Sequence, residues 1–201
     1  MRVIRACRET RRRVVAVYSE PDAQALHVQL ADAAVCIGGA AASESYLDVQ
    51  KVIAAAKRSG ADAIHPGYGF LAENAAAAQA VEDAGLIWIG PSPESIAAVG
   101  DKLRARQIAK EAGVPLIPGS DGAVAPGDVE AIAEATGYPL LLKAIGGGGG
   151  KGIRLVEDPS QLTSSLERAM GEAQSAFGAA EVYLERCVRP ARHIEVQILG
   201  D

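Results

Sequence analysis

The stretch that decides the fold reads LLLKAI at residues 140–145, GGGGG at 146–150 and Lys151-Gly152. The first part is an apolar strand that delivers one lysine, Lys143, to a run of glycines. Residues without a β-carbon let several backbone N–H groups face an anion at close range, and a lysine at each end supplies positive charge. The stretch therefore predicts a binding site for a polyphosphate.

The flanking residues separate three kinds of glycine-rich loop. A Walker A loop needs glycine six residues before its lysine and serine or threonine after it, but Ile145 and Gly152 stand at these positions. A dinucleotide-binding loop opens a helix, whereas residues 153–157 here read as a strand. A flexible linker, the remaining alternative, is not usually enclosed by two apolar strands. The pattern predicts a hairpin whose glycine turn folds over a nucleotide as a lid.

Composition predicts an ordered protein with one larger or two small domains. The chain has 201 residues, 49% hydrophobic, without an apolar run that could span a bilayer and without a secretory signal. Its net charge of -5 argues against nucleic acid as the main partner. The three cysteines lack the spacing of a disulfide framework or a metal site, so we expect them to be buried. We expect a soluble protein of the reducing cytoplasm that contacts no membrane.

The first thirteen residues are rich in arginine. A basic arm or the start of a transit peptide would explain this charge. However, Val3, Ile4 and Cys7 form an apolar stripe at helical spacing, and a strand begins at Val14 without a cleavable spacer. We favour a helix whose arginines are solvated or face another subunit.

Residues 1–90 alternate between helix and strand. We expect helices at about 1–12, 23–31, 46–58 and 74–84, and strands at 14–18, 34–37, 62–65 and 86–89. Ser45 is the expected start of the third helix and Gly60 its end. Short β-branched runs between helices predict a parallel sheet with helices on both faces, which is a Rossmann-like domain.

The second half predicts an α+β unit. Helices are expected at 93–99 and 102–112, started by Ser92 and Asp101, before a stretch rich in proline and glycine at 113–127 that marks a domain boundary. The elements expected after this stretch are a helix at 129–136, the two strands of the glycine hairpin, a helix from Asp158 to about 173 with a start like a capping box, and strands at 182–186 and 192–199.

Two lysines are candidate phosphate ligands. Because side chains alternate along a strand, Lys143 lies on the face opposite Leu140 and Leu142 and points away from the core of the lid. Lys102 follows the expected cap Asp101, so it lies in a first helical turn that favours anions. The adjoining glycines favour the phosphate role for Lys143 over the alternative of a lysine that reaches into water. Lys102, taken alone, would be an ordinary surface lysine, and only the nearby lid favours a phosphate role for it.

Three other segments are candidates for binding. In 192–198 the polar residues His193, Glu195 and Gln197 share one strand face. The strand at 182–188 ends in a charged pair and suits an adenine edge that is read by backbone groups. A plain strand is the alternative for both.

The segment His65–Asn74 follows a strand at the carboxyl end, where open α/β sheets place their sites. The alternative is a structural turn that packs Tyr68 and Phe70.

Together these segments resemble biotin carboxylase and, more closely, the α subunits of bacterial acyl-CoA carboxylases. The segments that carry the resemblance occur in the same order: His65–Asn74, Gly100-Asp101-Lys102, Gly113-Val114-Pro115, Pro118-Gly119-Ser120, Lys143-Ala144 with the glycine lid, and 192–197.

The resemblance implies the fold and the domains. Residues 1–100 would form a Rossmann-like pre-ATP-grasp domain that lacks its first strand. Residues 101–201 would form a truncated ATP-grasp domain, with an α+β lid subdomain at about 115–189 and the start of the central sheet at 190–201.

The resemblance also implies a ligase that phosphorylates bicarbonate with MgATP, or with Mn²⁺ in place of Mg²⁺, and carboxylates biotin on a carrier domain. A carboxyltransferase subunit would be a partner, and the carboxylase would be a homodimer. Carried over by position, Lys102 and Lys143 bind phosphates and Gly149 and Gly150 belong to the lid. The remaining assignments are Glu185, Arg186, Cys187 and Val188 at the adenine, and His193 at the nucleotide.

The resemblance has departures. Ala72 stands where serine is usual, Arg186 where lysine is common, and Cys187 and Val188 where bulkier residues are found. The family's metal ligands and catalytic residues would lie downstream of Asp201, so we expect neither within this chain, and no carboxylation by these 201 residues alone.

Two alternatives stay open. The chain could be a non-catalytic remnant that binds nucleotide or a subunit. It could also be another ATP-grasp ligase, such as a carbamoyl-phosphate or amino-acid ligase, although His65–Asn74 argues against this. Acyl-CoA specificity would belong to the partner carboxyltransferase.

Overall fold

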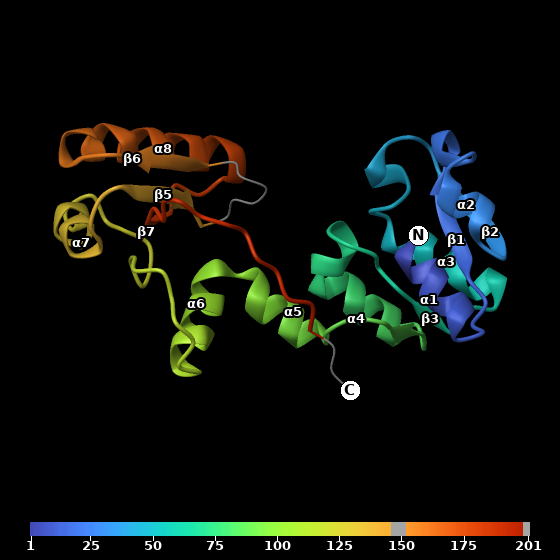
Figure 1. The fold of residues 1–201 in the computed structure, drawn as a ribbon. Coiled ribbons are helices and arrows are strands. Elements are labelled where there is room, and N and C mark those ends of the chain that lie inside the picture. Colours follow the sequence, from blue (N-terminus) through green and yellow to red (C-terminus); the bar gives the residue numbers. More distant parts are fainter. Residues whose placement is uncertain (146–151, 199–201) are drawn as a thin grey trace. The chain divides into compact units, whose positions relative to one another are not determined.

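The computed structural model describes residues 1–145 and 152–198 and divides into two compact units, Met1–Gly100 (unit 1) and Asp101–Asp201 (unit 2) (Figure 1). The predicted lid glycines Gly149 and Gly150 lie outside the described residues. The stretch 113–127 belongs to unit 2 rather than to a junction between the units. Its backbone is tied to a strand of unit 2, since Ser120 N donates to Leu184 O at 2.8 Å.

Unit 1 alternates short helices and strands. Its elements are α1 (Arg2–Glu9), β1 (Val15–Ser19), α2 (Leu26–Leu30), β2 (Ala33–Gly38), α3 (Val49–Ser59), β3 (Ala63–Ile64), α4 (Ala75–Asp83), β4 (Ile87–Trp88) and α5 (Pro93–Gly100), with 3-10 turns at Glu20–Asp22, Ala42–Glu44 and Phe70–Glu73. The predicted alternation is confirmed, although the helices are shorter than expected.

The strands of unit 1 pair in parallel, as predicted, but form two ladders rather than one. β1 pairs with β2 and β3 pairs with β4, and no ladder joins the two pairs in the described part of the chain. A cavity of about 270 Å³ is lined both by Val17 of β1 and by Ile64 of β3. Both pairs still contribute to one hydrophobic cluster, through Ile37 and Trp88. Side-chain packing therefore joins the two strand pairs, between which the described residues form no ladder.

The helix α3 begins later than the sequence predicts. Asp48, not Ser45, is its cap, because the carboxylate of Asp48 accepts a hydrogen bond from Lys51 N at 3.1 Å. Ser45 is fully buried and donates to Ala41 O at 2.9 Å instead. Gly60 ends the helix in the left-handed region at φ 69°, as expected for a residue without a β-carbon.

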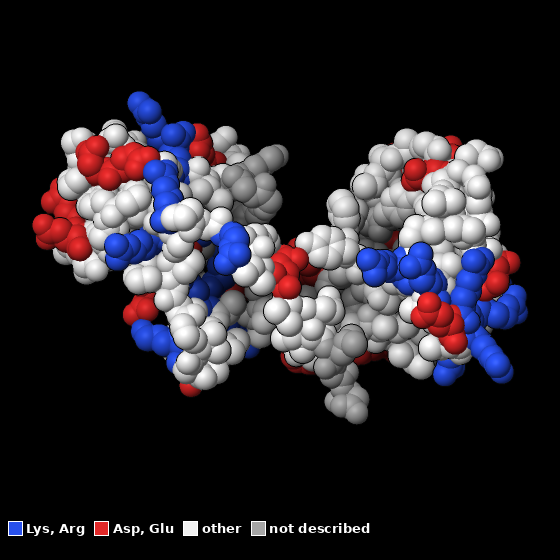
Figure 2. Space-filling model, viewed as in Figure 1, with Lys and Arg blue, Asp and Glu red and all other residues white. Residues whose placement is uncertain are grey.

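The arginine-rich first helix presents its charged side chains on the surface of unit 1. Ile4 is buried, whereas all six arginines of the first thirteen residues are exposed. Figure 2 shows Lys and Arg side chains gathered on the surface of unit 1 around α1. The expected burial of the cysteines is wrong, because Cys36 on the outer strand β2 is exposed and Cys7 and Cys187 are only partly buried. Within the ranges that the structure describes, no helix is both long and apolar enough to cross a membrane.

Unit 2 is built on an antiparallel sheet with strand order β6-β5-β7. Its elements are α6 (Lys102–Glu111), α7 (Val129–Thr136), β5 (Leu140–Ala144), β6 (Ile153–Val156), a 3-10 turn at Pro159–Gln161, α8 (Leu162–Phe177) and β7 (Val182–Arg186). The helix α8 packs along one face of the sheet (Figure 1). Leu140, Leu142 and Leu184 are fully buried at the centre of the core.

The prediction of a last strand at 192–199 is wrong for the described residues, 192–198. They form no strand and are all exposed, including Ile194 at 72% and Val196 at 81%. A strand depends on a ladder with a neighbour. The alternating pattern is present here, but no neighbouring strand is found among the described residues.

Candidate functional site

Lys143 lies on the face of the sheet that the sequence predicts. Along β5 the burial alternates, with Leu140, Leu142 and Ala144 in the core and Lys143 on the opposite face. Its neighbours in register are Ile153 of β6 and Tyr183 of β7. The lysine is therefore two residues from Ile145, the last described residue before the glycines.

Two cations converge on one buried carboxylate beside Lys143. Arg106 Nη1 donates to Glu185 Oε1 at 2.9 Å, and Lys143 Nζ donates to Glu185 Oε2. The side chain of Glu185 is only 10% exposed, against 15% for Arg106 and 23% for Lys143. Because little solvent reaches these groups, their interactions are stronger than those of a surface pair. The three groups together carry one net positive charge.

The aromatic ring of Tyr183 lies below the amine of Lys143. Tyr183 is 3% exposed, and its ring centroid lies 6.0 Å from Lys143 Nζ, a cation-π distance. Burial, and then the charge of Glu185, raise the pKa of Tyr183 to about 12. The phenol therefore stays neutral at ordinary pH, and the net positive charge of the cluster is preserved.

A second lysine approaches the same end of the hairpin from α6. Asp101 caps this helix, as predicted, by accepting hydrogen bonds from Leu103 N at 2.9 Å and Arg104 N at 3.0 Å. Lys102 Nζ donates to Ile145 O at 3.4 Å. The two predicted phosphate ligands, Lys102 and Lys143, are thus brought to the point where the glycine run begins.

Arg106 is the residue of this cluster that sequence reasoning missed. It lies four residues after Lys102 on α6, so both side chains are on one face of the helix. That four-residue spacing from Lys102 was the signal in the sequence that could have identified Arg106. Its partner Glu185 is 79 residues away in the sequence, and no local pattern connects the two.

The predicted adenine segment lies at the end of β7. Arg186 N donates to Pro118 O and Cys187 N donates to Pro139 O, each at 2.8 Å. These two amide groups are already engaged, so an adenine edge would have to use other backbone groups here. Val188 is 52% exposed. The adenine role of 185–188 stays a prediction.

His193 is not joined to this cluster in the described part of the chain. Its side chain is 83% exposed, and Nε2 lies 3.1 Å from Glu195 Oε1. The extended, unpaired backbone of 192–198 leaves the residue in solvent. Its nucleotide role also stays a prediction.

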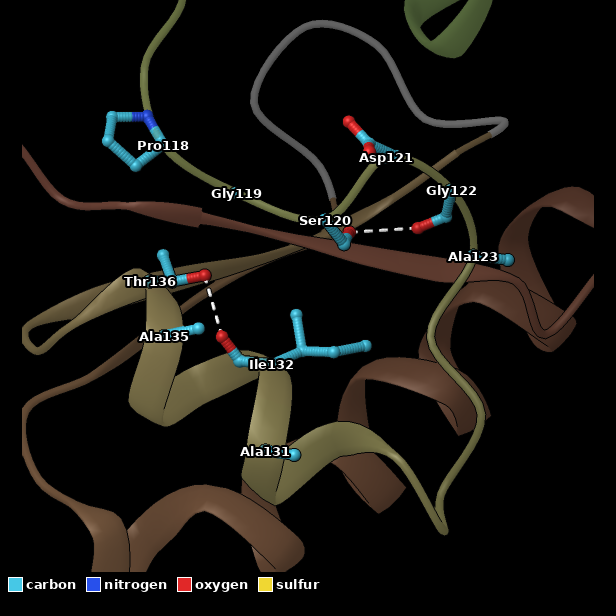
Figure 3. Close-up of a pocket in the computed structure, with 10 residues that line it drawn as sticks. All are labelled: Pro118, Gly119, Ser120, Asp121, Gly122, Ala123, Ala131, Ile132, Ala135 and Thr136. Carbon is cyan, nitrogen blue, oxygen red and sulfur yellow. Dashed lines mark hydrogen bonds between the residues drawn. The ribbon is translucent and has the colours of Figure 1, made fainter.

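A separate hollow of about 660 Å³ lies between the loop after α6 and the helix α7 (Figure 3). Its polar groups are satisfied locally, since Ser120 Oγ donates to Gly122 O and Thr136 Oγ1 donates to Ile132 O, each at 2.8 Å. The remaining lining is small or apolar, apart from Asp121, which pairs with Lys110. The hollow offers no cation for a phosphate. Its lining residues are Pro118, Gly119, Ser120, Asp121, Gly122, Ala123, Ala131, Ile132, Ala135 and Thr136.

The segment His65–Asn74 forms an exposed turn in unit 1. Gly67 and Gly69 adopt positive φ angles of 83° and 71°. Tyr68 is 89% exposed and Phe70 is 73% exposed. The alternative that the turn serves to pack these two rings is therefore wrong.

The charges of the cluster suit an anion. Within residues 1–145 and 152–198, no three His, Cys, Asp or Glu side chains come together as a metal site would require. Two lysines and an arginine, opposed by one carboxylate, lie on α6 and on β5, the strand that the glycine run follows in the sequence. A phosphate group suits this excess of donors.

The comparisons with known proteins identify two matched regions along the chain. The family model "Biotin carboxylase, N-terminal domain" matches residues 1–96, and the model "Carbamoyl-phosphate synthase L chain, ATP binding domain" matches residues 101–201. The chain belongs to the biotin carboxylase family. The match of 1–96 favours this family over other ATP-grasp ligases.

Similar curated biotin carboxylase proteins are longer than this chain. The biotin-dependent acyl-coenzyme A carboxylase alpha3 subunit of Mycobacterium leprae is 53% identical over all of this chain and 34% of its own length. The biotin carboxylase of Pseudomonas aeruginosa is 50% identical over all of this chain and 45% of its own length. The chain thus spans less than half the length of these relatives.

Solved structures of biotin carboxylases share the fold. The complex of biotin carboxylase with beta-gamma-ATP from Campylobacter jejuni is 44% identical, with a TM-score of 0.85 over 94% of this chain and 42% of that one. The biotin carboxylase domain of 2-oxoglutarate carboxylase from Hydrogenobacter thermophilus, in complex with MgADP and bicarbonate, is 43% identical with a TM-score of 0.82. The predicted fold class, α/β with part of an ATP-grasp domain, is confirmed.

Proposed function

We propose that this chain is the ATP-binding part of a biotin carboxylase, which uses MgATP and bicarbonate to carboxylate carrier-bound biotin. The observation that carries the proposal is the convergence of Lys102 and Lys143 where the glycine run begins. Family membership supports the choice of ATP over other polyphosphates.

The chain's own residues would perform the binding. Lys143 and Lys102 donate to phosphate oxygens, and the net positive charge beside Glu185 offsets the negative charge of the phosphates. Gly149 and Gly150, which lie outside the described residues, are proposed lid contacts. The proposed adenine residues are Glu185, Arg186, Cys187 and Val188, and His193 is proposed to contact the nucleotide.

The rest of the reaction depends on more than these residues. Mg²⁺, or Mn²⁺ in its place, would neutralise phosphate charge when bound. Bicarbonate, a biotin carrier domain and a carboxyltransferase subunit are the proposed partners, within a homodimeric carboxylase of the cytoplasm. Because the chain spans 34% to 45% of the length of its curated relatives, we propose that residues 1–201 alone bind ATP without carboxylating biotin.

Calorimetric titration with MgATP tests the proposal. We expect saturable binding by the folded chain, and a loss of about tenfold or more in affinity for Lys143→Met, because a charged hydrogen bond to phosphate is removed. Lys110→Met is the matched control. It removes a cation from the same unit whose partner Asp121 is 78% exposed, and it should change the affinity by less than about twofold.

Two results would contradict the proposal. One is no heat of binding from a chain whose circular dichroism shows a folded state. The other is the same affinity in the wild type and in Lys143→Met. A biotin-dependent ATPase assay tests the second part of the proposal. Turnover by residues 1–201 would contradict the claim that they bind ATP without carboxylating biotin.

A further inference from the structure

Glu185 presents a conflict that the proposed function alone does not resolve. Its carboxylate binds Lys143, the lysine that is also assigned to phosphate. If Lys143 were the sole partner, its turn toward a phosphate would leave a carboxylate that is 10% exposed without a counter-charge. Leaving a buried charge unpaired is costly. A second cation that stays in place removes this cost.

Arg106 has the geometry of such a cation. Its Nη1 donates to Glu185 Oε1 at 2.9 Å while its Nη2 donates to Ile117 O at 3.1 Å. The guanidinium is thereby fixed by two acceptors from different segments, and 15% of the side chain is exposed. Lysine, which carries a single point charge, could not hold both acceptors in the same way.

The two lysines of α6 do not share this arrangement. Lys102 lies one turn before Arg106 and donates to Ile145 O at the glycine end of the hairpin. Lys110 lies one turn after it and pairs with Asp121 in an exposed bridge, with side chains 56% and 78% exposed. Of these three, only Arg106 is bound to the buried carboxylate that also holds Lys143.

We propose that Arg106 is a positioning residue for nucleotide binding, which keeps Glu185 neutralised so that Lys143 can donate to phosphate. Arg106 acts through Glu185 and Lys143 and does not itself contact the nucleotide. This inference rests on the proposed function. It adds Arg106 of α6 as the residue that determines how readily Lys143 leaves Glu185 to bind phosphate.

A charge-removal cycle tests the proposal. Arg106→Gln should weaken MgATP binding by about tenfold to a hundredfold, the usual range for one hydrogen bond to a charged group. Binding of adenosine, which has no phosphate, should change by less than about twofold in the same calorimetric titration. Arg106→Lys keeps the charge but loses one of the two acceptors, so it should have an intermediate affinity.

The double variant Arg106→Gln/Glu185→Gln provides the decisive comparison. Glu185→Gln converts the carboxylate to an amide but keeps the backbone groups of residue 185, through which the adenine contact is proposed. Lys143 then has no buried negative charge to neutralise, so MgATP affinity should return to within about threefold of the wild type. A purely structural role of Arg106 predicts the opposite, because the double variant would then have lost two contacts. Lys110→Gln on the same helix should bind like the wild type.

A second readout needs no nucleotide. The rate at which an acetylating reagent modifies Lys143, followed by mass spectrometry, reports how firmly Glu185 holds the amine. We expect a rate about tenfold lower in Arg106→Gln, where Lys143 is the sole counter-charge, and recovery of the rate in the double variant.

The two readouts separate the two claims. If the wild type binds MgATP but Arg106→Gln has unchanged affinity and acetylation, the inference is overturned and the proposed function stands. If no variant binds MgATP while acetylation follows the expected order, the proposed function fails and the control of Lys143 by Arg106 is supported. A folded double variant that remains weak and slowly acetylated also overturns the inference.

Discussion

Unit 1 and unit 2 hold their strands together differently. In unit 1 parallel strands join two at a time through helical crossovers, while in unit 2 the central strand β5 has antiparallel neighbours on both sides. The least exposed residues of unit 1 are small, such as Ala55 and Ala78, whereas unit 2 buries Leu140 and Leu142 completely. Large apolar side chains of unit 1, such as Ile53 and Trp88, keep a few per cent of their surface exposed, whereas these two leucines of unit 2 keep none.

The largest expected effect is in the core of unit 2. Leu142→Ala should lower the free energy of unfolding by about 2–5 kcal/mol, because a large side chain is removed from a fully buried site and leaves a cavity. Trp88, the sole tryptophan of the sequence, lies in unit 1. Urea unfolding followed by circular dichroism should therefore shift, while the midpoint of Trp88 fluorescence should not.

A matched control is Leu155→Ala on β6, where the leucine is 37% exposed, and its cost should be below about 1 kcal/mol. Equal shifts in both probes for Leu142→Ala would show that the two units unfold as one. The difference in packing between unit 1 and unit 2 would then not affect how each unit unfolds.

The next effect concerns the loop that lines the hollow of unit 2. A β-carbon on Gly119 would lie 2.4 Å from Leu184 O and 3.1 Å from Glu185 Cα, whereas one on Gly122 in the same loop would meet nothing within 4 Å. Gly119→Ala should cost about 1–3 kcal/mol by overpacking and should displace Glu185. Thermal unfolding of both alanine variants measures the difference, and an equal melting temperature would contradict the predicted clash.

The helix caps allow a direct comparison of the units. Asp48 caps α3 in unit 1 and Asp101 caps α6 in unit 2, so replacement of either by alanine should cost about 1 kcal/mol. Only Asp101→Ala should also weaken MgATP binding, because α6 carries Lys102 and Arg106. A change in ATP affinity with Asp48→Ala, or none with Asp101→Ala, would argue against α6 as the supporting element.

The smallest expected effect on stability comes from Tyr183, whose phenol ionises only at alkaline pH. Its pKa is raised from 10.0 to about 12, so the folded state holds the proton more tightly than the unfolded state does. The associated stability is fully present below pH 10 and is lost as the pH rises through about 12. Tyr183→Phe should remove this alkaline loss of stability from unit 2. Urea midpoints measured from about pH 9 to about pH 12, which spans the ordinary and the raised pKa of the phenol, would show the difference. An unchanged slope would show that Tyr183 does not ionise in that range.

Much of unit 2 follows from local pattern. The alternation in β5 and the position of Lys143 on its outer face were predicted, and so were the bounds of α7 and β7. The cap of α6 by Asp101 was predicted as well. The cap of α3 was not, because Ser45 and Asp48 are equally good candidates in sequence, and only the burial of Ser45 against Ala41 decides between them.

The candidate site was predicted in part. The lysines and the glycine run are recognisable locally, since charge, alternation and the absence of a β-carbon act over a few residues. Arg106 was missed, and 192–198 was expected to be a strand although the described residues provide no ladder for it.

The sequence by itself determined which residues could bind a phosphate and the family to which they point, because these signals are local and occur in a specific order. Tertiary structure alone decided which charge neutralises which. The pairing of Arg106 with Glu185 spans 79 residues, and such a contact exists only once α6, β5 and β7 have packed together.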